Sequence, residues 1–443
     1  SAQDFDDAVS IERLSGGSFL LGVHIADVSH YVRPETALEA DAFERATSVY
    51  FPDLTLPMLP EKLSNDLCSL RPGVERLTLS ALLEIDNHGG IVRSEFHPSV
   101  IRTAARMTYA SVFKIFEGDA EERRKYAALV PGLLAMRDLA RVLREKRMEE
   151  GSLDFDLVEP ELVYKEGRLA SIVPAGRNEA HRLIEEFMVA ANVAVASFLA
   201  RKGVPSLYRV HPAPSVADLE KLRDVLAGFG LVLPPADRIQ SKNLGRVLEM
   251  VKGRPEEKFI NVQVLRALKL AVYSDENVGH YGLAKTEYTH FTSPIRRWPD
   301  LAVHRVLKRA LRKEKSEKMP LASWADHASE RERNADEAEK DLLEWRIFRF
   351  LKNRLGEEFE GTIVDMTKTG LVVELDDFLV DGVIPYRDIG GDYYDRRGEK
   401  TLRGRRTGRA FELGGKVRVV LAACDPVLRR MTFVPASGPG GTA

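Results

Sequence analysis

Three carboxylates stand close together near the start of the chain: Asp4, Asp6 and Asp7, which flank Phe5. Carboxylates this close repel one another and raise each other's pKa unless a cation neutralises them. Crowded oxygen ligands suit Mg²⁺, which gives up its water reluctantly and shares its coordination with phosphate. In a strand Asp4 and Asp6 point to one side and Asp7 to the other, so one metal site for all three requires a turn or bulge. An exposed acidic loop is the alternative.

A basic segment near the other end of the chain is the second chemical feature. It lies within a protein of net charge −2, and its cationic residues are Arg396, Arg397, Lys400, Arg403, Arg405, Arg406 and Arg409. We predict that this segment is a loop that follows the phosphates of a nucleic acid strand, because the chain as a whole offers no attraction to one. Tyr393, Tyr394 and Phe359 would add base stacking. A solvated arginine loop is the alternative.

Hydrophobic periodicity predicts the elements that must hold these residues. Alternating side chains predict one or two strands at 18–32 and further strands at 77–102. Helical periodicity is clearest at 179–202. Further helices are expected at 121–150, with a break at Val130-Pro131, and at 216–228, 258–273, 295–312 and 323–354, the last ending at Gly356.

After Gly356 the sequence turns to five short strand-like runs: EFEGTIVDM, LVVEL, GVIPY, GKVRVVLAACD and MTFVPA. Five strands in so short a segment predict a small antiparallel barrel of the OB type. The tail SGPGGTA is expected to be disordered. The predicted fold class is therefore α+β, with a mixed α/β domain at 1–355, an OB barrel at 356–436 and a disordered tail at 437–443.

Composition argues against a membrane role. No apolar run approaches the roughly 18 residues that cross a bilayer, and no signal peptide opens the chain. Cys68 and Cys424 match no zinc or redox spacing, which indicates buried thiols in a reduced, cytoplasmic setting. The length of 443 residues favours two or more domains. The abrupt acidic opening predicts a further domain upstream of Ser1.

Taken together, the motifs resemble the ribonuclease II/ribonuclease R family, whose catalytic domain is of the RNB type. The matching segments are DFDDAV (4–9), HIADVSHYV (24–32), LPMLPEKLSNDLCSL (56–70), EAHRLIEEFMVAANV (179–193) and HYGLAKTEYTHFTSPIRRWPDLAVHR (280–305). The terminal barrel is similar to the S1 domain of that family. The resemblance covers nearly the whole chain.

The resemblance implies a processive 3′→5′ exoribonuclease that hydrolyses single-stranded RNA to 5′-mononucleotides. In the family four aspartates form the site, and three of them correspond to Asp4, Asp6 and Asp7. The fourth would lie six residues before Asp4, upstream of Ser1. We expect two Mg²⁺ ions, with Mn²⁺ able to replace them, because two metals activate water and neutralise the phosphate together. Asp6 is the carboxylate expected to matter most for activity.

The same resemblance assigns roles to Arg296 and Glu186. Arg296 would stabilise the phosphate through the paired donors of its guanidinium, at the start of a helix beginning near Ile295 after Pro294. Its neighbour Arg297 is a second RNA-binding candidate, and a structural salt bridge is the alternative for either arginine. Glu186 is expected to face the site as a catalytic group, whereas helix solvation or a pair with Arg182 is its alternative.

Two aromatic residues are expected to stack on RNA bases. Tyr50 corresponds to a residue that stacks on the 3′-terminal base in the family, and Phe155 is a second candidate. Arg403, Arg405 and Arg406 of the basic segment are assigned to RNA binding. Leu371 stands where many S1 domains carry an aromatic residue, so we expect charge to contribute more than stacking on the barrel.

The resemblance leaves one alternative open, an RNA-binding protein whose RNB domain is inactive because the fourth aspartate is missing. An unrelated factor with an S1 domain would leave the first 355 residues without a role. We expect a cytoplasmic monomer with no membrane partner.

Overall fold

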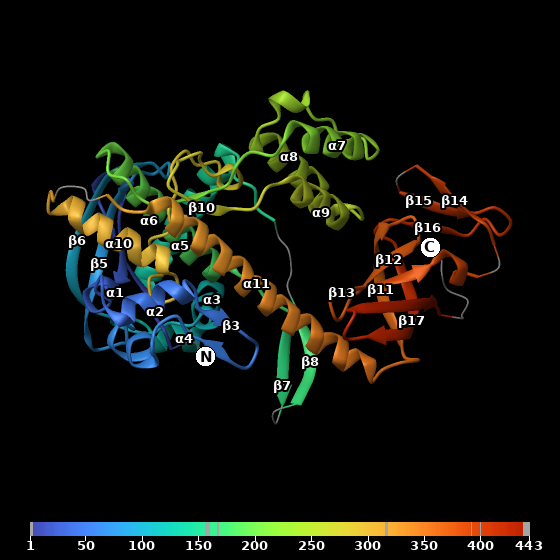
Figure 1. Cartoon of the computed structure of the whole chain (residues 1–443), viewed down its shortest axis with the longest axis horizontal. Helices are drawn as coiled ribbons and strands as arrows, with labels where there is room; N and C mark the ends of the chain where they lie inside the picture. Colours follow the sequence, from blue (N-terminus) through green and yellow to red (C-terminus); the bar gives the residue numbers. More distant parts are fainter. Residues whose placement is uncertain are drawn as a thin grey trace. The chain divides into compact units, whose positions relative to one another are not determined.

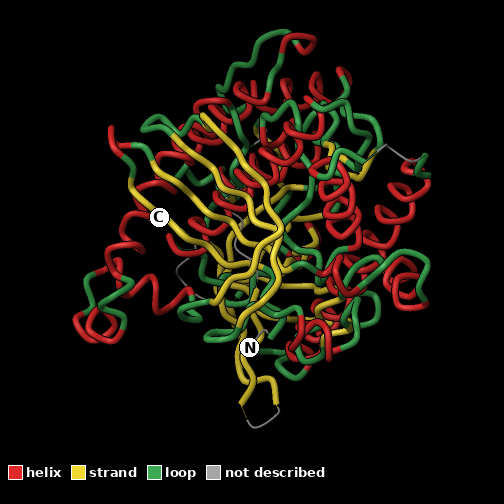
Figure 2. The backbone as a smooth tube through the Cα atoms, turned by 90° about the vertical axis from the view of Figure 1, so that its left-hand side faces the viewer, coloured by secondary structure: helices red, strands yellow, loops and turns green. Residues whose placement is uncertain are grey.

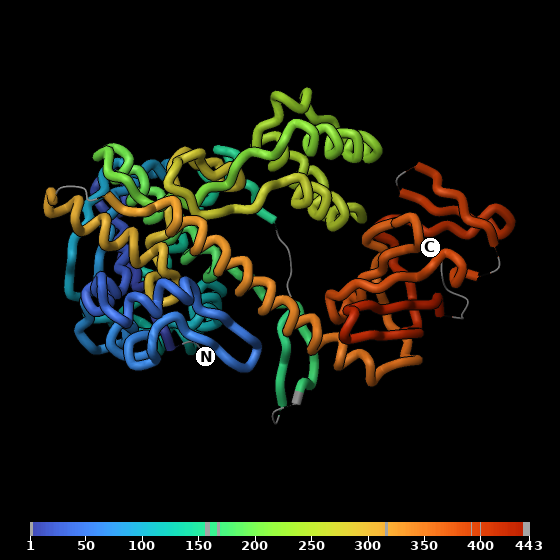
Figure 3. Tube along the Cα trace, in the orientation of Figure 1, coloured from blue at the N-terminus to red at the C-terminus, as the bar shows by residue number. Residues whose placement is uncertain are grey.

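The structure is a computed structural model that describes residues 3–155, 160–165, 168–314, 318–390, 392–398 and 400–436. Its contacts form two compact units. The first comprises Ser1–Ser152, Arg177–Pro212 and Leu270–Glu337, and the second comprises Leu153–Gly176, Ala213–Lys269 and Ala338–Ala443. The units alternate along the sequence, whereas the predicted domains are consecutive. Figure 3 traces the chain in colours that follow the residue number. The predicted division at 355/356 stays a prediction, and the predicted disordered tail lies outside the described residues.

The first unit is built on a four-stranded antiparallel sheet of order β1-β2-β5-β6 (Figures 1 and 2). Its strands are β1 (Asp7–Arg13), β2 (Phe19–Ala26), β5 (Glu75–Ile85) and β6 (Ile91–Arg102). Leu21, Val23 and Ile25 alternate along β2 with no exposed surface, which is the two-residue period of a strand. The strands predicted at 18–32 and 77–102 are confirmed, except that residues 28–31 form a short helix.

Helices pack on this sheet, with α6 in contact with β2, β5 and the helices α3, α5 and α10. The helices of this unit are α1 (Val28–Tyr31), α2 (Ala37–Arg45), α3 (Tyr109–Glu117), α4 (Ala120–Lys125), α5 (Val130–Glu150), α6 (Glu179–Arg201), α10 (Trp298–Leu311) and the first part of α11 (Leu321–Lys352). The smaller elements are β3 (Val49–Tyr50), β4 (Thr55–Leu56), β9 (Tyr208–Val210), β10 (Val272–Ser274), η1 (Ser15–Gly17), η2 (Leu63–Leu67) and η4 (Tyr281–Leu283).

Helix α6 corrects one expectation from composition. It is long and apolar enough to cross a membrane by length and composition alone, contrary to the absence of such a run inferred above. However, 56% of the relevant window is buried, and Phe187, Ala191, Val195 and Leu199 lie in the core at helical spacing. Core helices of folded domains pass the same test, so α6 is the central helix of the first unit.

The second unit contains a closed five-stranded barrel, which confirms the predicted OB architecture. Its strands are β11 (Glu358–Met366), β12 (Gly370–Leu375), β13 (Val380–Pro385), β17 (Lys416–Asp425) and β18 (Arg430–Pro435). The unit also holds β7 (Pro160–Lys165), β8 (Arg168–Pro174), α7 (Val216–Ala227), α8 (Ser241–Val251), α9 (Glu257–Ala267), η3 (Ala236–Arg238), η5 (Tyr386–Asp388), and a sheet of β14 (Tyr394–Arg397), β15 (Thr401–Gly404) and β16 (Ala410–Glu412).

Some local features of the structure differ from the expectations. The basic segment is not a plain loop, because it contains β14, β15 and β16, and α8 was not predicted. Leu371 has no exposed surface, and the expectation that charge contributes more than stacking on the barrel stays a prediction. Helix α10 begins at Trp298 instead of Ile295, because Pro299 is the proline of its first turn, where a missing N–H costs nothing.

Trp298, the first residue of α10, packs in the core of the first unit, so its removal should destabilise the fold. Its ring is 1% exposed and contacts Phe43 and Trp324 at ring-centroid distances of 4.7 and 5.1 Å. Trp298→Ala should lower the free energy of unfolding by about 3–5 kcal/mol, the usual loss for a buried large aromatic residue. Denaturant unfolding followed by circular dichroism measures this change. Trp345→Ala, at a residue that is 37% exposed on α11, is the matched control; equal losses would contradict the prediction.

Candidate functional site

The segment that carries Asp4 and Asp6 precedes β1 and is fixed by its backbone. The amide of Phe5 donates to Ser69 Oγ (3.1 Å), and its carbonyl accepts from the amide of Leu70 (3.0 Å). The carbonyl of Asp6 accepts from the amide of Ala26 (2.8 Å), and Asp7 opens β1 opposite Ile25. The first acidic residues therefore have a defined position next to the sheet and are not an exposed loop.

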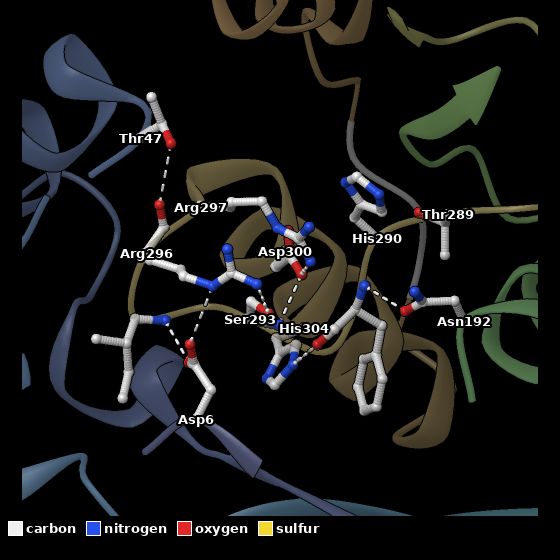
Figure 4. Close-up of polar contacts among 12 residues, drawn as sticks. Asp6, Thr47, Asn192, Thr289, His290, Ser293, Arg296, Arg297, Asp300 and His304 are labelled. Carbon is white, nitrogen blue, oxygen red and sulfur yellow. Dashed lines mark hydrogen bonds and ion pairs between the residues drawn. The ribbon is translucent and has the colours of Figure 1, made fainter. Parts of the chain in front are cut away.

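Asp6 is the buried member of the acidic group, with only 5% of its surface exposed. Its Oδ1 accepts a hydrogen bond from the amide of Ile295 (2.8 Å), and its Oδ2 lies 3.9 Å from Nε of Arg296 (Figure 4). Two segments far apart in the sequence, 4–7 and 293–297, thus meet at this carboxylate.

Burial disfavours the ionised form of both Asp6 and Asp7, and the positive charge of Arg296 offsets this effect only in part. Burial raises the pKa of Asp6 well above its usual range, although Arg296 and the Ile295 amide lower it, and Asp7 raises it further. Burial also raises the pKa of Asp7, against the lowering effect of Arg296. A divalent cation at this place would replace the missing positive charge.

The structure separates the roles of the two neighbouring arginines. Arg297 donates to both oxygens of Asp300 (2.9 and 2.8 Å), and Asp300 has no exposed surface. Arg297 therefore forms the structural salt bridge that was the alternative for it, and its assignment to RNA binding stays a prediction. Arg296 keeps 44% of its side chain exposed and donates to Ser293 Oγ (3.1 Å), so it is the arginine that can reach a phosphate.

The loop that carries Arg296 is held by side chains from two helices. Asn192 Oδ1 on α6 accepts from the amide of Phe291 (2.9 Å), and His304 Nε2 on α10 contacts the Phe291 carbonyl (2.8 Å). Asp300 Oδ1 accepts from the amide of Ser293 (2.8 Å). All three of these side chains are buried. The position of the Arg296 backbone is consequently set before any ligand arrives.

Glu186 is buried and ion-paired, and its expected catalytic role stays a prediction. It is 3% exposed, and Arg147 holds both of its oxygens, with Nη2 at 2.6 Å from Oε1 and Nε at 3.0 Å from Oε2. Burial raises its pKa, and Arg147 lowers it. This arrangement indicates a structural pair with Arg147, and not the pair with Arg182 considered above. Its neighbour Glu185 is more exposed and pairs with Arg177.

Two tyrosines lie beside the acidic group. Tyr50, as expected, is partly exposed, and its hydroxyl donates to Asp4 Oδ2 (3.1 Å). Tyr109 was missed: its ring is 45% exposed and stacks on His181 at 3.9 Å. Burial raises the pKa of the Tyr109 hydroxyl most, the charge of Asp7 raises it further, and the charge of Arg296 lowers it. Its sequence context shows only a helix start after Thr108, which is why residue patterns did not identify it.

The other RNA-binding candidates lie in the second unit. Arg403 and Arg406 are exposed on β15 and in the turn after it, and Phe155 is partly exposed. Arg405 is exposed as well but pairs with Asp395 through two hydrogen bonds (2.8 and 2.7 Å). Tyr393 is 82% exposed beside these arginines. The second unit therefore presents arginine and aromatic groups on one small sheet.

The carboxylate oxygens of the acidic group are ligands that suit a magnesium ion, although the protein would supply only a few of the ligands. Among the described residues no group of three or more His, Cys, Asp or Glu side chains is arranged as a metal cage. Mg²⁺ is commonly held by one or two carboxylates, waters and substrate phosphates. The Oδ2 of Asp6, which lies 3.9 Å from Nε of Arg296, and the carboxylate of Asp7 are oxygen ligands that meet that requirement, and Asp4 stands two residues from Asp6.

Comparison with known proteins gives a consistent match. Residues 1–313 match the model of the RNB domain. Ribonuclease R of Aquifex aeolicus is 42% identical over 98% of this chain, and that of Escherichia coli is 39% identical over 98%. The chain spans only 62% and 55% of their lengths. The solved ribonuclease R of Mycoplasma genitalium in complex with ribose-methylated single-stranded RNA superposes with a TM-score of 0.88 at 28% identity, covering 98% of this chain and 69% of that one.

The unbalanced charge of Asp6 predicts that its neutralisation stabilises the metal-free protein. A carboxyl whose pKa is raised by folding favours the folded state at low pH, and this contribution is lost as the pH rises through the raised pKa. In EDTA at neutral pH, Asp6→Asn should therefore raise the melting temperature, by roughly 2–4 °C for each 1 kcal/mol in a domain of 150–250 residues. The difference should vanish near pH 4. Asp41→Asn, at an exposed residue paired with Arg45, is the control; a lower melting temperature for Asp6→Asn would refute the prediction.

Proposed function

The chain belongs to the RNB domain family, and we propose that it is a 3′→5′ exoribonuclease that hydrolyses single-stranded RNA to 5′-mononucleotides. The observation that carries this proposal is the contact of buried, under-compensated Asp6 with half-exposed Arg296. This contact joins a cation-binding group to a phosphate-binding group. The ribonuclease R relatives support the choice of RNA as substrate, and the family resemblance supports attack from the 3′ end.

In the proposed mechanism the protein supplies ligands, orientation and charge. Asp6 and Asp7, with Asp4 beside them, would hold Mg²⁺. Mg²⁺ held there would supply an activated water and would neutralise charge at the phosphate. Arg296 would donate paired hydrogen bonds to the phosphate oxygens, and its charge persists at every physiological pH. Because Asn192, Asp300 and His304 fix the loop beforehand, little reorganisation is needed.

Aromatic and basic groups would bind the RNA strand. Tyr50, whose hydroxyl donates to Asp4, would stack on the terminal base, an interaction that tolerates every sequence and contributes about 1–3 kcal/mol per base. Phe155 is the second stacking candidate. Arg403 and Arg406 would follow the phosphates, and Arg405 would join them by leaving Asp395. We further propose a cytoplasmic monomer in which Mn²⁺ can replace Mg²⁺.

An RNA-binding protein with an inactive RNB domain is the second candidate. The lack of a three-ligand metal cage among the described residues favours it. The raised pKa values of Asp6 and Asp7 favour the enzyme, because an inactive site has no physical reason to keep two buried, mutually repelling carboxylates. Single-stranded RNA labelled at either end separates the two: Mg²⁺-dependent release of mononucleotides from the 3′ end supports the enzyme, and binding without cleavage supports the alternative.

Asp6→Asn should abolish turnover and leave RNA binding nearly intact. The asparagine keeps an oxygen for the Ile295 amide but removes the charge that binds the cation. Turnover is measured by mononucleotide release, and binding by fluorescence anisotropy with a labelled oligonucleotide. Asp41→Asn should retain full activity. Equal loss of binding and turnover in Asp6→Asn would mean that the role of Asp6 is misassigned.

Tyr50→Ala should change the length of the final undegraded oligonucleotide. Without the stacking contact, short products leave the enzyme before the last cleavages, so the end product should become longer. Gel analysis of the limit product measures this change, and Tyr50→Phe, which keeps the ring but loses the hydroxyl bonded to Asp4, should preserve the product length. End products unchanged in Tyr50→Ala would remove Tyr50 from the RNA site.

A further inference from the structure

Arg296 combines a fixed backbone with a lightly held side chain. Its carbonyl accepts from the amide of Ser48 (3.0 Å) and from Thr47 Oγ1 (3.3 Å), and its amide donates to the carbonyl of Ser293 (3.3 Å). Its guanidinium, in contrast, donates to Ser293 Oγ alone among the hydrogen bonds defined in the described residues, and 44% of the side chain is exposed. The side chain can therefore change rotamer without moving the loop.

The guanidinium faces the carboxylates at a distance that allows charge attraction but no close hydrogen bond. Its Nε lies 3.9 Å from Asp6 Oδ2, whereas Arg297 reaches both oxygens of Asp300 at 2.8 and 2.9 Å. Figure 4 shows Arg296 directed toward Asp6 and Arg297 directed toward Asp300. The charge of Arg296 lowers the pKa of both Asp6 and Asp7, which burial raises. Arg296 thus already performs part of the neutralisation that a metal ion would perform.

We propose that Arg296 is a built-in counter-ion of Asp6 and Asp7, which releases these carboxylates when a divalent cation binds and then turns to the RNA phosphate. The inference rests on the proposed function and adds a resting-state role to the expected contact of Arg296 with phosphate. The physical reason is like-charge repulsion: a guanidinium and a divalent cation compete for the same carboxylate oxygens, because each cation makes the approach of the other less favourable.

This exchange couples cation binding to phosphate binding. The guanidinium competes with the cation for the carboxylates, so it weakens cation binding in the absence of RNA. Once displaced, the same charge has no carboxylate partner at close range and attracts a phosphate instead. Coupling of this kind is reciprocal, so the phosphate must also favour cation binding by drawing Arg296 away from Asp6. Metal and RNA would then assemble together, and the protein would hold the cation weakly when no substrate is present.

The test is Mn²⁺ binding in the absence of RNA, followed by electron paramagnetic resonance on metal-stripped protein. Arg296→Met removes the competing charge and keeps most of the side-chain length, so it should tighten Mn²⁺ binding by roughly five-fold or more. Arg296→Lys retains the charge and should stay near the wild-type affinity. Arg71→Met removes an exposed arginine that is paired with Asp66 and should leave the affinity unchanged.

Thermal unfolding gives a second readout that does not depend on catalysis. In EDTA, Arg296→Met should melt below the wild type, because Asp6 and Asp7 lose their counter-charge. Addition of Mn²⁺ should raise the melting temperature of Arg296→Met by more than it raises the melting temperature of the wild type. If Arg296→Met does not fold, Arg296→Gln provides the same comparison.

The outcomes separate this inference from the proposed function. Unchanged or weaker Mn²⁺ binding in a folded Arg296→Met protein would overturn the counter-ion role. The proposed metal site would still stand if the wild type binds Mn²⁺ and the Asp6→Asn variant does not. Absence of Mn²⁺ binding to the wild type would overturn both.

Discussion

Asp6 has one oxygen on the amide of Ile295 and the other toward Arg296, in a place with almost no access to water. The rest of the site follows from this contact. It fixes the acidic segment against the loop before α10, and it places a charge where burial opposes ionisation. A charge in such a place must be paired, protonated or bound to a cation. The protein pairs it only in part, and this partial pairing leaves the carboxylate able to bind a cation.

The groups around this contact fall into two classes. Asn192, Asp300 and His304 are buried and hydrogen-bonded to the loop backbone, so they fix the position of the backbone that carries Arg296. Arg296 and the tyrosines beside the acidic group keep exposed surface. The buried groups support the loop backbone, and the charged side chain of Arg296 extends from this support with part of its surface exposed. Arg297 belongs to the support and not to the exposed class, since its charge is cancelled by Asp300.

Sequence patterns predicted the elements better than the assignment of individual side chains. The strands of the first unit, the central helix and the five-stranded barrel have strong periodicity, and each was found. Arg296 and Arg297 are adjacent and of one type, so only burial against Asp300 could separate them. The ion pair of Glu186 likewise could not be predicted from the sequence, because its partner Arg147 lies on another helix. Tyr109 acquires its relation to Asp7 through the approach of α3, and no local pattern encodes that approach.

The second unit is assembled from three separate stretches of chain, and this has a consequence for protein engineering. Helix α9 contacts β11; Lys258 pairs with Glu374 of the barrel, and Glu256 pairs with Lys400 beside β15. A cut at residue 355 would therefore remove the barrel but leave behind helices that lose their partners and expose new surface. Gene fusions or domain transplants that treat the barrel as a detachable cassette should aggregate, unless the excised piece carries its helical neighbours with it.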